Sequence, residues 1–436
     1  MTTIDTRPFL NSEDPTLRIS AVSQNLKESE ILKIAGQIKG MIREGHKIIN
    51  LTIGDFSSQQ FPIPDRLLSD IKTALDEGHT NYPPAAGVLE CREAVRTLFA
   101  ERLGLDYPVE SVLIAGGARP MIAGTYLSLV NEGENVVYPL PSWNNNHYTT
   151  FVGGNAIEIA TTSENKFFPR IEDIEPHLPT ARLICLNSPL NPTGTVVSTS
   201  ELKRLSEAIV RENKRRKENN ERALYLMYDQ VYWMLTHGET EHVTPVGLVP
   251  EMAAYTIFVD GISKGFAATG LRVGWAVGPK DVISKMAAIL THIGAWAPRP
   301  EQVATSKLLA DTEAIDSYRN AMSKEVLARL KILADGINGL QASGHNVEAI
   351  APEGAIYLSI RMGVRGKTTP GGVTLKTDED IRSYLLTDAK IGLIPFFCFG
   401  LKDRGEGWFR VSVGTVSEQD CHQVIENLTQ ALSALK

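Results

Sequence analysis

The sequence predicts an α/β protein in which a large domain, built on a mainly parallel seven-stranded sheet flanked by helices, is joined to a smaller α+β domain. Between about Glu90 and Pro279, short apolar runs rich in β-branched residues alternate with longer amphipathic runs. Strands and crossover helices of a parallel sheet produce this alternation. The 436 residues also exceed the size at which one hydrophobic core keeps growing, so a second domain is expected.

Seven apolar runs are the candidate strands. They are Ser111 to Ala115, Asn135 to Tyr138, Ala156 to Ile159, Arg182 to Leu186, Ala223 to Tyr228, Thr256 to Asp260 and Val273 to Val277. The stretch from Glu201 to Asn219 has apolar residues at helical spacing and charges elsewhere, which predicts a helix lying on a face of the sheet.

The chain is expected to divide into three parts. Residues 1–54 are expected to form an N-terminal arm and part of the small domain, with a helical pattern from Glu28 to Arg43. Residues 55–313 are expected to form the large domain. Residues 314–436 contain long helical patterns from Ala314 to about Leu340 and from Gln419 to Leu435, and are expected to form the small C-terminal domain.

Composition and charge argue against several functional classes. The formal net charge is −7, and the most basic run, Lys214 to Lys217, ends a helical pattern, so no nucleic-acid partner is expected. The N-terminal sequence lacks a signal peptide and no apolar run reaches membrane-spanning length, which predicts a cytoplasmic protein without a membrane partner. The four cysteines are far apart, which indicates buried free thiols and no metal site.

Residues with reactive chemistry follow three of the predicted strands. Ligands of open α/β sheets bind beyond the carboxyl ends of the strands, so these positions are the first to consider. Lys264 follows one strand; an amine in a cleft loses charge stabilisation and becomes a nucleophile toward an aldehyde. A lone lysine usually lies at the surface, but here Ser263 and Arg272 could gather with it around one phosphate.

Asp229 ends another strand, where a bare carboxylate is costly unless it is paired with a cation such as a protonated ring nitrogen. A helix cap or an ion pair with an arginine is the alternative. Gly117 lies in a sharp turn before a helix expected from Met121 to Leu129, whose free N–H groups suit a phosphate. Trp143 and Tyr232 could face the same ligand, although each residue type is more often part of a core.

The segment Gly261 to Gly274, which contains Ser263, Lys264 and Arg272, resembles the cofactor-lysine signature of the aspartate aminotransferase family of fold type I pyridoxal-phosphate enzymes. Supporting motifs occur in the family's order and extend the resemblance from about residue 48 to 436: Gly54, Tyr82 in Asn81 to Gly87, Gly117 with Ala118, Trp143, Asn191 to Gly194, Asp229 to Tyr232, and Arg410 in Trp408 to Ser412.

The resemblance implies a role for each matching residue around pyridoxal 5′-phosphate. Lys264 would bond to the cofactor's aldehyde and later shuttle a proton, and Asp229 would keep the ring nitrogen protonated. The phenolic oxygen of the ring would accept hydrogen bonds from Tyr232 and Asn191. Trp143 would stack on the ring. The remaining matches would hold the phosphate: Gly117, Ala118, Ser263, Arg272 and, from a second subunit, Tyr82. This last role implies a homodimer with sites at the interface.

The same resemblance implies transfer of an amino group from an L-amino acid to a 2-oxo acid by a ping-pong mechanism. Arg410, with Asn191 and the backbone at Gly54, would bind the substrate's α-carboxylate. Arg119 matches a position where some relatives carry a lysine facing a distal carboxylate, which favours an acidic donor such as aspartate or glutamate. Arg299 is a second candidate for that cation.

The chain also departs from the family's pattern. After Gly54 it reads Asp55-Phe56-Ser-Ser-Gln-Gln where relatives have Glu-Pro-Asp-Phe, and Phe396, Phe397 and Phe399 lie where a Pro-Gly-Ser-x-Phe-Gly pattern is usual. Aromatic or other neutral donors therefore remain an alternative. A β-lyase or a cyclopropane-forming synthase shares these motifs, and a non-catalytic regulator is the least favoured because of the acidic charge and the lack of an added N-terminal domain.

Overall fold

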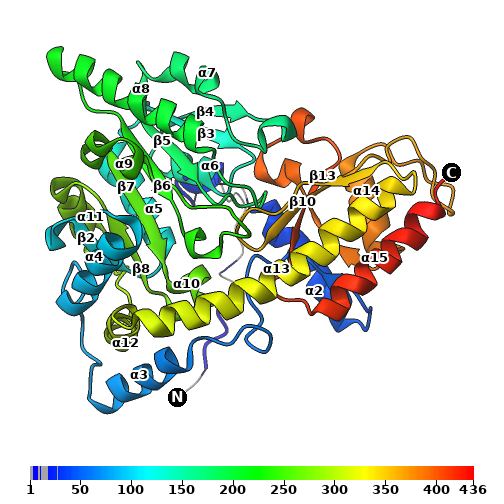
Figure 1. Ribbon diagram of the computed structural model, residues 1–436, viewed down its shortest axis with the longest axis horizontal. Helices are drawn as coiled ribbons and strands as arrows, with labels where there is room; N and C mark the ends of the chain where they lie inside the picture. Colours follow the sequence, from blue (N-terminus) through cyan, green and yellow to red (C-terminus); the bar gives the residue numbers. More distant parts are fainter. Residues whose placement is uncertain (1–2, 8–9, 11–17, 27) are drawn as a thin grey trace.

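The computed structural model describes residues 3–7, 10, 18–26 and 28–436. The remaining positions of the predicted N-terminal arm lie outside the described residues. Figure 1 shows two bodies side by side, a larger one around a central sheet and a smaller one that holds the C-terminus. None of the described helices is both long and apolar enough to cross a lipid bilayer.

The central sheet has seven strands in the order β2-β8-β7-β6-β5-β3-β4. Their bounds are β2 Val112–Ala115, β3 Asn135–Leu140, β4 Asn155–Ala160, β5 Ala181–Asn187, β6 Tyr225–Asp229, β7 Thr256–Gly261 and β8 Gly274–Val277. The strands from β4 to β7 pair in parallel, whereas β8 runs antiparallel to both of its neighbours, β7 and β2. The predicted seven-stranded, mainly parallel sheet is confirmed.

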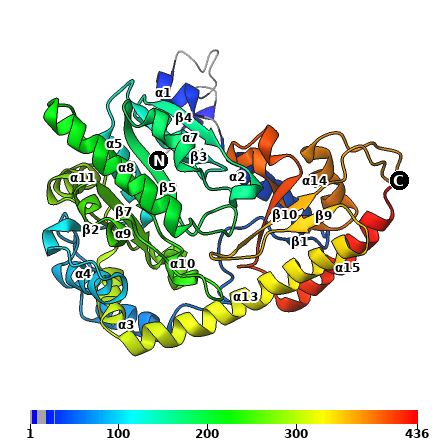
Figure 2. The same ribbon diagram turned by 45° about the horizontal axis from the view of Figure 1, so that its top comes forward.

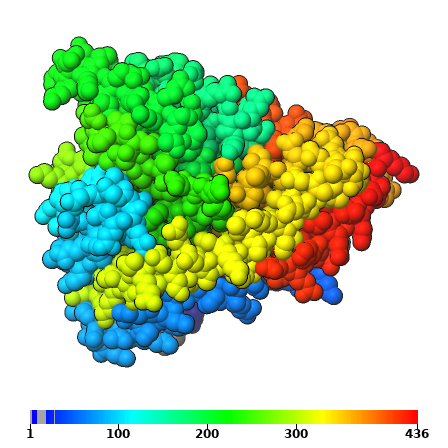
Figure 3. All heavy atoms as spheres, in the orientation of Figure 1, coloured from blue at the N-terminus to red at the C-terminus, as the bar shows by residue number. Residues whose placement is uncertain are grey.

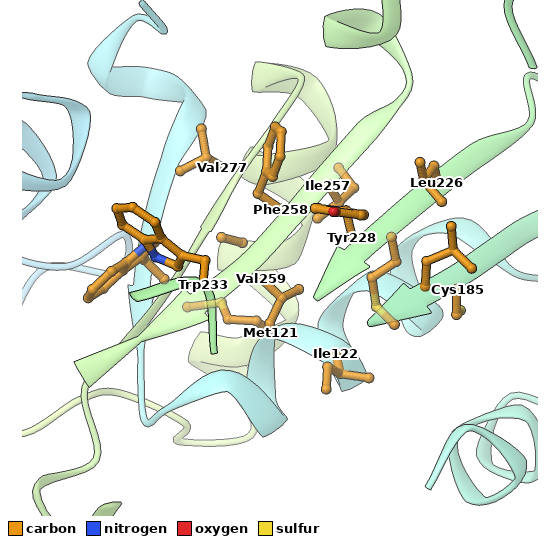
Figure 4. Packing of buried hydrophobic residues seen from close by; sticks show 14 of the residues in the cluster. Met121, Ile122, Cys185, Leu226, Tyr228, Trp233, Ile257, Phe258, Val259 and Val277 are labelled. Atoms are coloured by element: carbon orange, nitrogen blue, oxygen red, sulfur yellow. The ribbon is translucent and has the colours of Figure 1, made fainter. Parts of the chain in front are cut away.

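Helices cover both faces of this sheet, so its strands other than the largely exposed edge strand β4 read as continuous apolar runs. The helices of the larger body are α3 Asp65–Asp76, α4 Leu89–Leu103, α5 Ala118–Leu129, α6 Asn145–Phe151, α7 Ile171–Ile174, α8 Thr199–Glu218, α9 Pro245–Leu248, α10 Ile262–Gly265, α11 Lys280–His292 and α12 Arg299–Leu309. Figure 4 shows Met121 and Ile122 of α5 near the apolar side chains of β6 and β7. Because α5 begins at Ala118, three residues before the predicted start, Arg119 lies in its first turn.

The smaller body is built on an antiparallel sheet in the order β12-β13-β10-β9. Its elements are α13 Thr312–Ala342, β9 Val347–Ala349, β10 Tyr357–Met362, α14 Asp378–Thr387, β11 Ile391–Gly392, β12 Ile394–Pro395, β13 Trp408–Ser412 and α15 Glu418–Ser433. Figures 2 and 3 show α13 running from the larger body along the smaller one, where α15 lies beside it. The predicted α+β character is confirmed; the exact divisions at residues 54 and 313 stay a prediction.

The N-terminal elements are α1 Ala21–Asn25, α2 Glu30–Arg43 and β1 Ile49–Asn50. Strand β1 pairs with β11 of the smaller body, and α2 buries Ile34 and Ile38. The prediction for the cysteines needs one correction, because Cys398 is only partly buried whereas the other three thiols are buried. Its position on the segment between β12 and β13, beside the partly exposed Phe397, leaves one side open.

Candidate active site

A cavity of about 620 Å³ lies beyond the carboxyl ends of β5, β6 and β7, where the larger and smaller bodies meet. Most of the site residues predicted from the sequence line it: Gly54, Ala118, Arg119, Trp143, Asn191, Asp229, Tyr232, Ser263, Lys264, Arg272 and Arg410. Residues from both bodies therefore share one cavity, although the chain separates them by up to several hundred positions.

Lys264 lies on the short helix α10, directly after the buried strand β7. Its Nζ donates a hydrogen bond of 2.7 Å to the carbonyl oxygen of Gly54. Burial lowers the pKa of the Lys264 amine to about 8; Asp55 opposes this shift, and the charges of Arg410, Arg119 and Arg272 add to it. At neutral pH a useful fraction of this amine is therefore unprotonated and nucleophilic.

Asp229 ends β6, and its Oδ1 accepts a hydrogen bond of 3.1 Å from the backbone N–H of Val231. Burial raises the pKa of this carboxyl group to about 7, despite the hydrogen bond and the charge of Lys264. A carboxylate held in such a place gains most from a cation beside it. The protonated nitrogen of a pyridine ring has this chemistry, so Asp229 fits the cofactor that the resemblance implies.

Arg410, on β13, lines the cavity from the side of the smaller body. It is 2% exposed, and donates from Nη1 to Asn191 Oδ1 at 3.1 Å and from Nη2 to the carbonyl oxygen of Thr52 at 2.5 Å. Its guanidinium lies 4.8 Å from the ring centroid of Tyr357 and 5.1 Å from that of Phe399. Its Nε has no partner within the described part of the chain. The group is thus fixed in orientation with a donor left over for an anion.

Tyr232 joins the two bodies through its hydroxyl, which lies 2.6 Å from that of Tyr357. Because neither hydroxyl reaches bulk solvent, this pair fixes the ring of Tyr232 on one wall of the cavity. Lys264 Nζ lies 5.8 Å from the centroid of that ring. The phenol of Tyr232 and the amine of Lys264 can therefore reach one ligand.

Arg272 lines the cavity, and two glycines, Gly117 and Gly274, lie close behind it. Arg272 donates to the carbonyl oxygens of Thr269 (2.7 Å) and Gly116 (2.8 Å), and burial lowers its pKa. A Cβ at Gly117, whose φ is +97°, would lie 2.4 Å from Arg272 Nη2, and a Cβ at Gly274 would lie 2.4 Å from the backbone of Gly117. Only glycines admit this approach. The N–H of Gly117 already bonds to Ala115 (2.6 Å), so Gly117 contributes shape more than a donor.

Ala118 and Ser263 add donors beside this cradle. Ala118 is the first residue of α5, a twelve-residue helix whose first N–H groups have no partner within the helix. Ser263 is buried on α10 and lines the cavity. A guanidinium, a hydroxyl and a helix N-terminus around a glycine-shaped hollow fit a phosphate group.

Trp143 lies on the loop after β3, and the guanidinium of Arg119 stacks 4.6 Å from its ring centroid. The loop is held by a chain of hydrogen bonds that the sequence did not reveal. Tyr126 donates to Asn145 Oδ1 (2.9 Å), and Asn145 Nδ2 donates to Ser142 Oγ (2.8 Å). Both Asn145 and Ser142 line the cavity, so this chain sets the position of the face that Trp143 presents.

Besides Gly117, which lies beside Arg272 but does not itself line the cavity, two predicted residues lie outside it. Tyr82 is 81% exposed and its ring packs 5.0 Å from that of Trp296. Arg299 begins α12 and does not line the cavity. The predicted roles of both residues depend on a second subunit.

Sequence reasoning missed several residues of the site: Thr52, Asp55, Asn145, Thr269, Tyr357, and Ile31, Leu32, Ala35 and Lys39 of α2. Asp55 could have been found, since it directly follows Gly54. The others carry no local signal, because only the fold brings α2, β10 and the loop after β3 to one cavity. Within the described residues, no group of three or more His, Cys, Asp or Glu is arranged to hold a metal ion.

The fold and the site together define a fold type I pyridoxal-phosphate-dependent enzyme. The sequence pattern of the family described as aminotransferase class I and II matches residues 46–428. The chain therefore belongs to this family. It is an aminotransferase, and the cofactor of the family is pyridoxal 5′-phosphate.

Individual relatives cover almost the whole chain. An aspartate aminotransferase of Rhizobium meliloti is 29% identical over 97% of this chain and 97% of its own length. The aspartate/prephenate aminotransferase of Thermus thermophilus is 28% identical over 94% of this chain and 97% of its own.

Solved structures agree with these relatives. The aspartate aminotransferase of R. meliloti has a TM-score of 0.86 at 28% identity and covers 96% of this chain and 99% of the other. The aspartate aminotransferase of T. thermophilus with maleate has a TM-score of 0.83 at 26% identity and covers 95% and 99%.

Proposed function

We propose that this aminotransferase takes its amino group from an acidic L-amino acid, such as aspartate or glutamate, and passes it to a 2-oxo acid in two half-reactions. The observation that carries the proposal is the presence of two arginines, Arg410 and Arg119, in the same cavity as the proposed cofactor-binding residues. Arg410 is buried on the smaller body, and Arg119 lies on the first turn of α5. A substrate with carboxylates at both ends matches such a pair.

Arg119 is the cation that distinguishes an acidic donor. Apart from stacking on Trp143, it has no hydrogen bond or ion pair within the described residues. A positive charge in this state gains from an arriving carboxylate. The relative from T. thermophilus was solved with maleate, a dicarboxylate, and the relatives reported above are named for aspartate or for aspartate and prephenate, which agrees with this preference.

The chain's own residues hold the cofactor and the substrate in this proposal. Asp229 would pair with the ring nitrogen, Tyr232 and Asn191 would bond to the phenolic oxygen, and Trp143 would stack on the ring. Gly117, Ala118, Ser263 and Arg272 would hold the phosphate. Arg410, Asn191 and the backbone at Gly54 hold the α-carboxylate.

When bound, pyridoxal phosphate supplies an electron-withdrawing ring that stabilises negative charge at the substrate's Cα. Lys264 then acts as the base that removes the proton from Cα. Its pKa of about 8 leaves part of the amine unprotonated at neutral pH, as this step requires. Arg410 fixes the substrate by its carboxylate, so that the Cα–H bond faces Lys264.

The structure gives less support to an aromatic donor than to an acidic one. Phe396 and Phe399 are buried, and Phe396 packs on Phe167 with ring centroids 5.0 Å apart. None of Phe396, Phe397 and Phe399 lines the cavity, although Phe399 stacks on Arg410. Phe399 therefore supports the guanidinium of Arg410, and other residues form the cavity wall that faces the substrate's side chain.

The proposal includes a homodimer in which Tyr82 reaches the phosphate of the partner's site. The ring of Tyr82 is exposed, and so is Ile293, which precedes Trp296 on the segment against which Tyr82 packs. Exposed apolar groups of this kind are what a partner subunit would cover. Arg299 stays a second candidate for the distal carboxylate, from across that interface. The cytoplasmic location expected from the N-terminal sequence stays a prediction.

The test is a donor screen. Each proteinogenic amino acid is added to the cofactor-loaded enzyme without an acceptor, and loss of the cofactor's visible absorbance is followed. Aspartate or glutamate should bleach it fastest, and 2-oxoglutarate should restore it with formation of glutamate in equal amount. Fastest bleaching by aromatic donors would reject the acidic preference. Products of elimination, with no glutamate, would indicate a β-lyase.

A further inference from the structure

Asp55 lies on a segment, residues 51–57, that runs along the end of β13. Ser412 donates from its backbone N–H to Leu51 (2.9 Å) and from its hydroxyl to Ile53 (2.7 Å). The N–H of Ser57 donates to the carbonyl oxygen of Gly414 (2.8 Å). These bonds attach both ends of the segment to the smaller body.

Asp55 itself lies against the turn that follows that strand. A Cβ at Gly414 would lie 2.1 Å from the carbonyl oxygen of Asp55, so the backbone can approach only a glycine there. The backbone of Asp55 is therefore in direct contact with the smaller body at Gly414.

The side chain of Asp55 points the other way, to the larger body. Its Oδ1 accepts hydrogen bonds from the hydroxyl of Thr269 (2.7 Å) and from the N–H of Phe56 (2.8 Å). Thr269 lies between Lys264 and Arg272, and its carbonyl oxygen accepts a bond from Arg272 (2.7 Å). Asp55 therefore joins the smaller body to the segment that carries both of the proposed cofactor-binding cations.

One other hydrogen bond joins the same two segments, from Lys264 Nζ to the carbonyl oxygen of Gly54. A neutral amine keeps two N–H groups, so this bond survives deprotonation of Lys264, but it uses the same nitrogen that the proposed function assigns to the cofactor's aldehyde and to the proton at Cα. The bond between Thr269 and Asp55 has no such competing role, because neither side chain takes part in the proposed chemistry.

We propose that Asp55 is a positioning residue, which through its hydrogen bond from Thr269 holds Gly54 at the substrate's α-carboxylate whether or not the amine of Lys264 is engaged in the chemistry. The inference rests on the proposed role of Gly54 and Arg410 in binding that carboxylate. It assigns a function to the first residue of the loop in which this chain departs from its family's pattern.

The experiment separates the hydrogen bond from the charge. Thr269→Val and Asp55→Ala remove the bond, whereas Thr269→Ser and Asp55→Asn keep a donor and an acceptor. The first two variants should raise KM for L-aspartate, L-tyrosine and 2-oxoglutarate about tenfold each, with kcat within about threefold, because all three ligands share the carboxylate that Gly54 binds. The Ser and Asn variants should restore KM to within about threefold.

Binding without turnover gives a second readout. The Kd of maleate, measured by calorimetry, should rise by the same factor in Thr269→Val and Asp55→Ala. Gln59→Ala is the matched control, since Gln59 lies exposed on the same loop. A melting temperature near that of the unmodified protein shows that each variant is folded.

Two outcomes would overturn the inference: unchanged KM and Kd in Thr269→Val and Asp55→Ala, or an Asp55→Asn variant as impaired as Asp55→Ala, which would assign the effect to charge. Failure of the acidic preference is distinguishable, because it changes which ligand the unmodified enzyme prefers. The ratio between variant and unmodified enzyme for any one ligand is unaffected by that preference.

Discussion

Arg410 donates a hydrogen bond of 3.1 Å to Asn191, although 219 positions separate the two residues. Asn191 follows β5 of the larger sheet and Arg410 lies on β13 of the smaller one. This contact joins the proposed site of the cofactor's phenolic oxygen to that of the substrate's α-carboxylate. The orientation of the two sheets therefore decides whether a substrate held by its carboxylate presents Cα to Lys264.

We expect Lys264→Ala to lose the visible absorbance of the bound cofactor and to lower kcat by about 100- to 10,000-fold, because it removes both the covalent anchor and the base. Lys280→Ala is the control, since Lys280 lies exposed at the start of α11. Absorbance spectra and transamination assays of the two variants test both expected losses. Full activity in Lys264→Ala would refute the assignment.

The pKa of Lys264, about 8, predicts how its reactivity depends on pH in the protein freed of cofactor. Below pH 8 the amine is mainly protonated, so its rate of acylation should rise about tenfold per pH unit and level off above pH 8. An ordinary exposed lysine continues to gain reactivity up to about pH 10.4. Peptide mass spectrometry after brief labelling measures the acylation rates of Lys264 and of an exposed lysine. A Lys264 rate that keeps rising to pH 10 would contradict the low pKa.

Arg410→Met should lower kcat/KM for every donor, and the loss should correspond to about 3 to 5 kcal/mol of transition-state stabilisation. The variant removes a buried cation from the α-carboxylate and leaves Asn191 without that partner. Arg410→Lys should recover only part of this loss, since an ammonium cannot bind a carboxylate through two parallel N–H groups. Steady-state kinetics with acidic and neutral donors measure the effect. A loss restricted to acidic donors would place Arg410 at the distal carboxylate instead.

Arg119→Met should lower kcat/KM for aspartate and glutamate. The loss should correspond to about 1.5 to 3 kcal/mol of transition-state stabilisation, the usual contribution of a hydrogen bond to a charged group. Neutral donors serve as the internal control and should change little. Equal losses for all donors would indicate that Arg119 supports Trp143, on which it stacks, and does not contact the substrate.

Gly194→Ala should lower the free energy of unfolding by at least about 2 kcal/mol. Gly194 has a φ of +74°, and a Cβ there would lie 2.0 Å from the carbonyl oxygen of Tyr357. Gly339→Ala is the control, because Gly339 lies in α13 with nothing within 4 Å of its Cβ position. Thermal unfolding of the two variants tests the prediction. Equal melting temperatures would show that β10 can move away from Gly194.

By itself the sequence located the strands of the larger sheet. Period and composition placed all seven strands to within a few residues, and for all but the largely exposed edge strand β4 the reason is that a strand buried on both faces must be apolar along its length. Asp229 and Lys264 stand out for the same reason, since each is an ionisable group directly after such a run. The family signature around Lys264 then indicated the cofactor.

Only the tertiary structure decided which distant groups meet. Tyr357 contacts Tyr232 across the junction of the two bodies. The contact between Thr52 and Arg410 spans 358 positions, and that between Asp55 and Thr269 spans 214. Local patterns describe which face of an element is buried, but carry no record of the partner that covers it. The side chains between the two sheets, and hence the shape offered to a substrate, follow from packing over the whole chain.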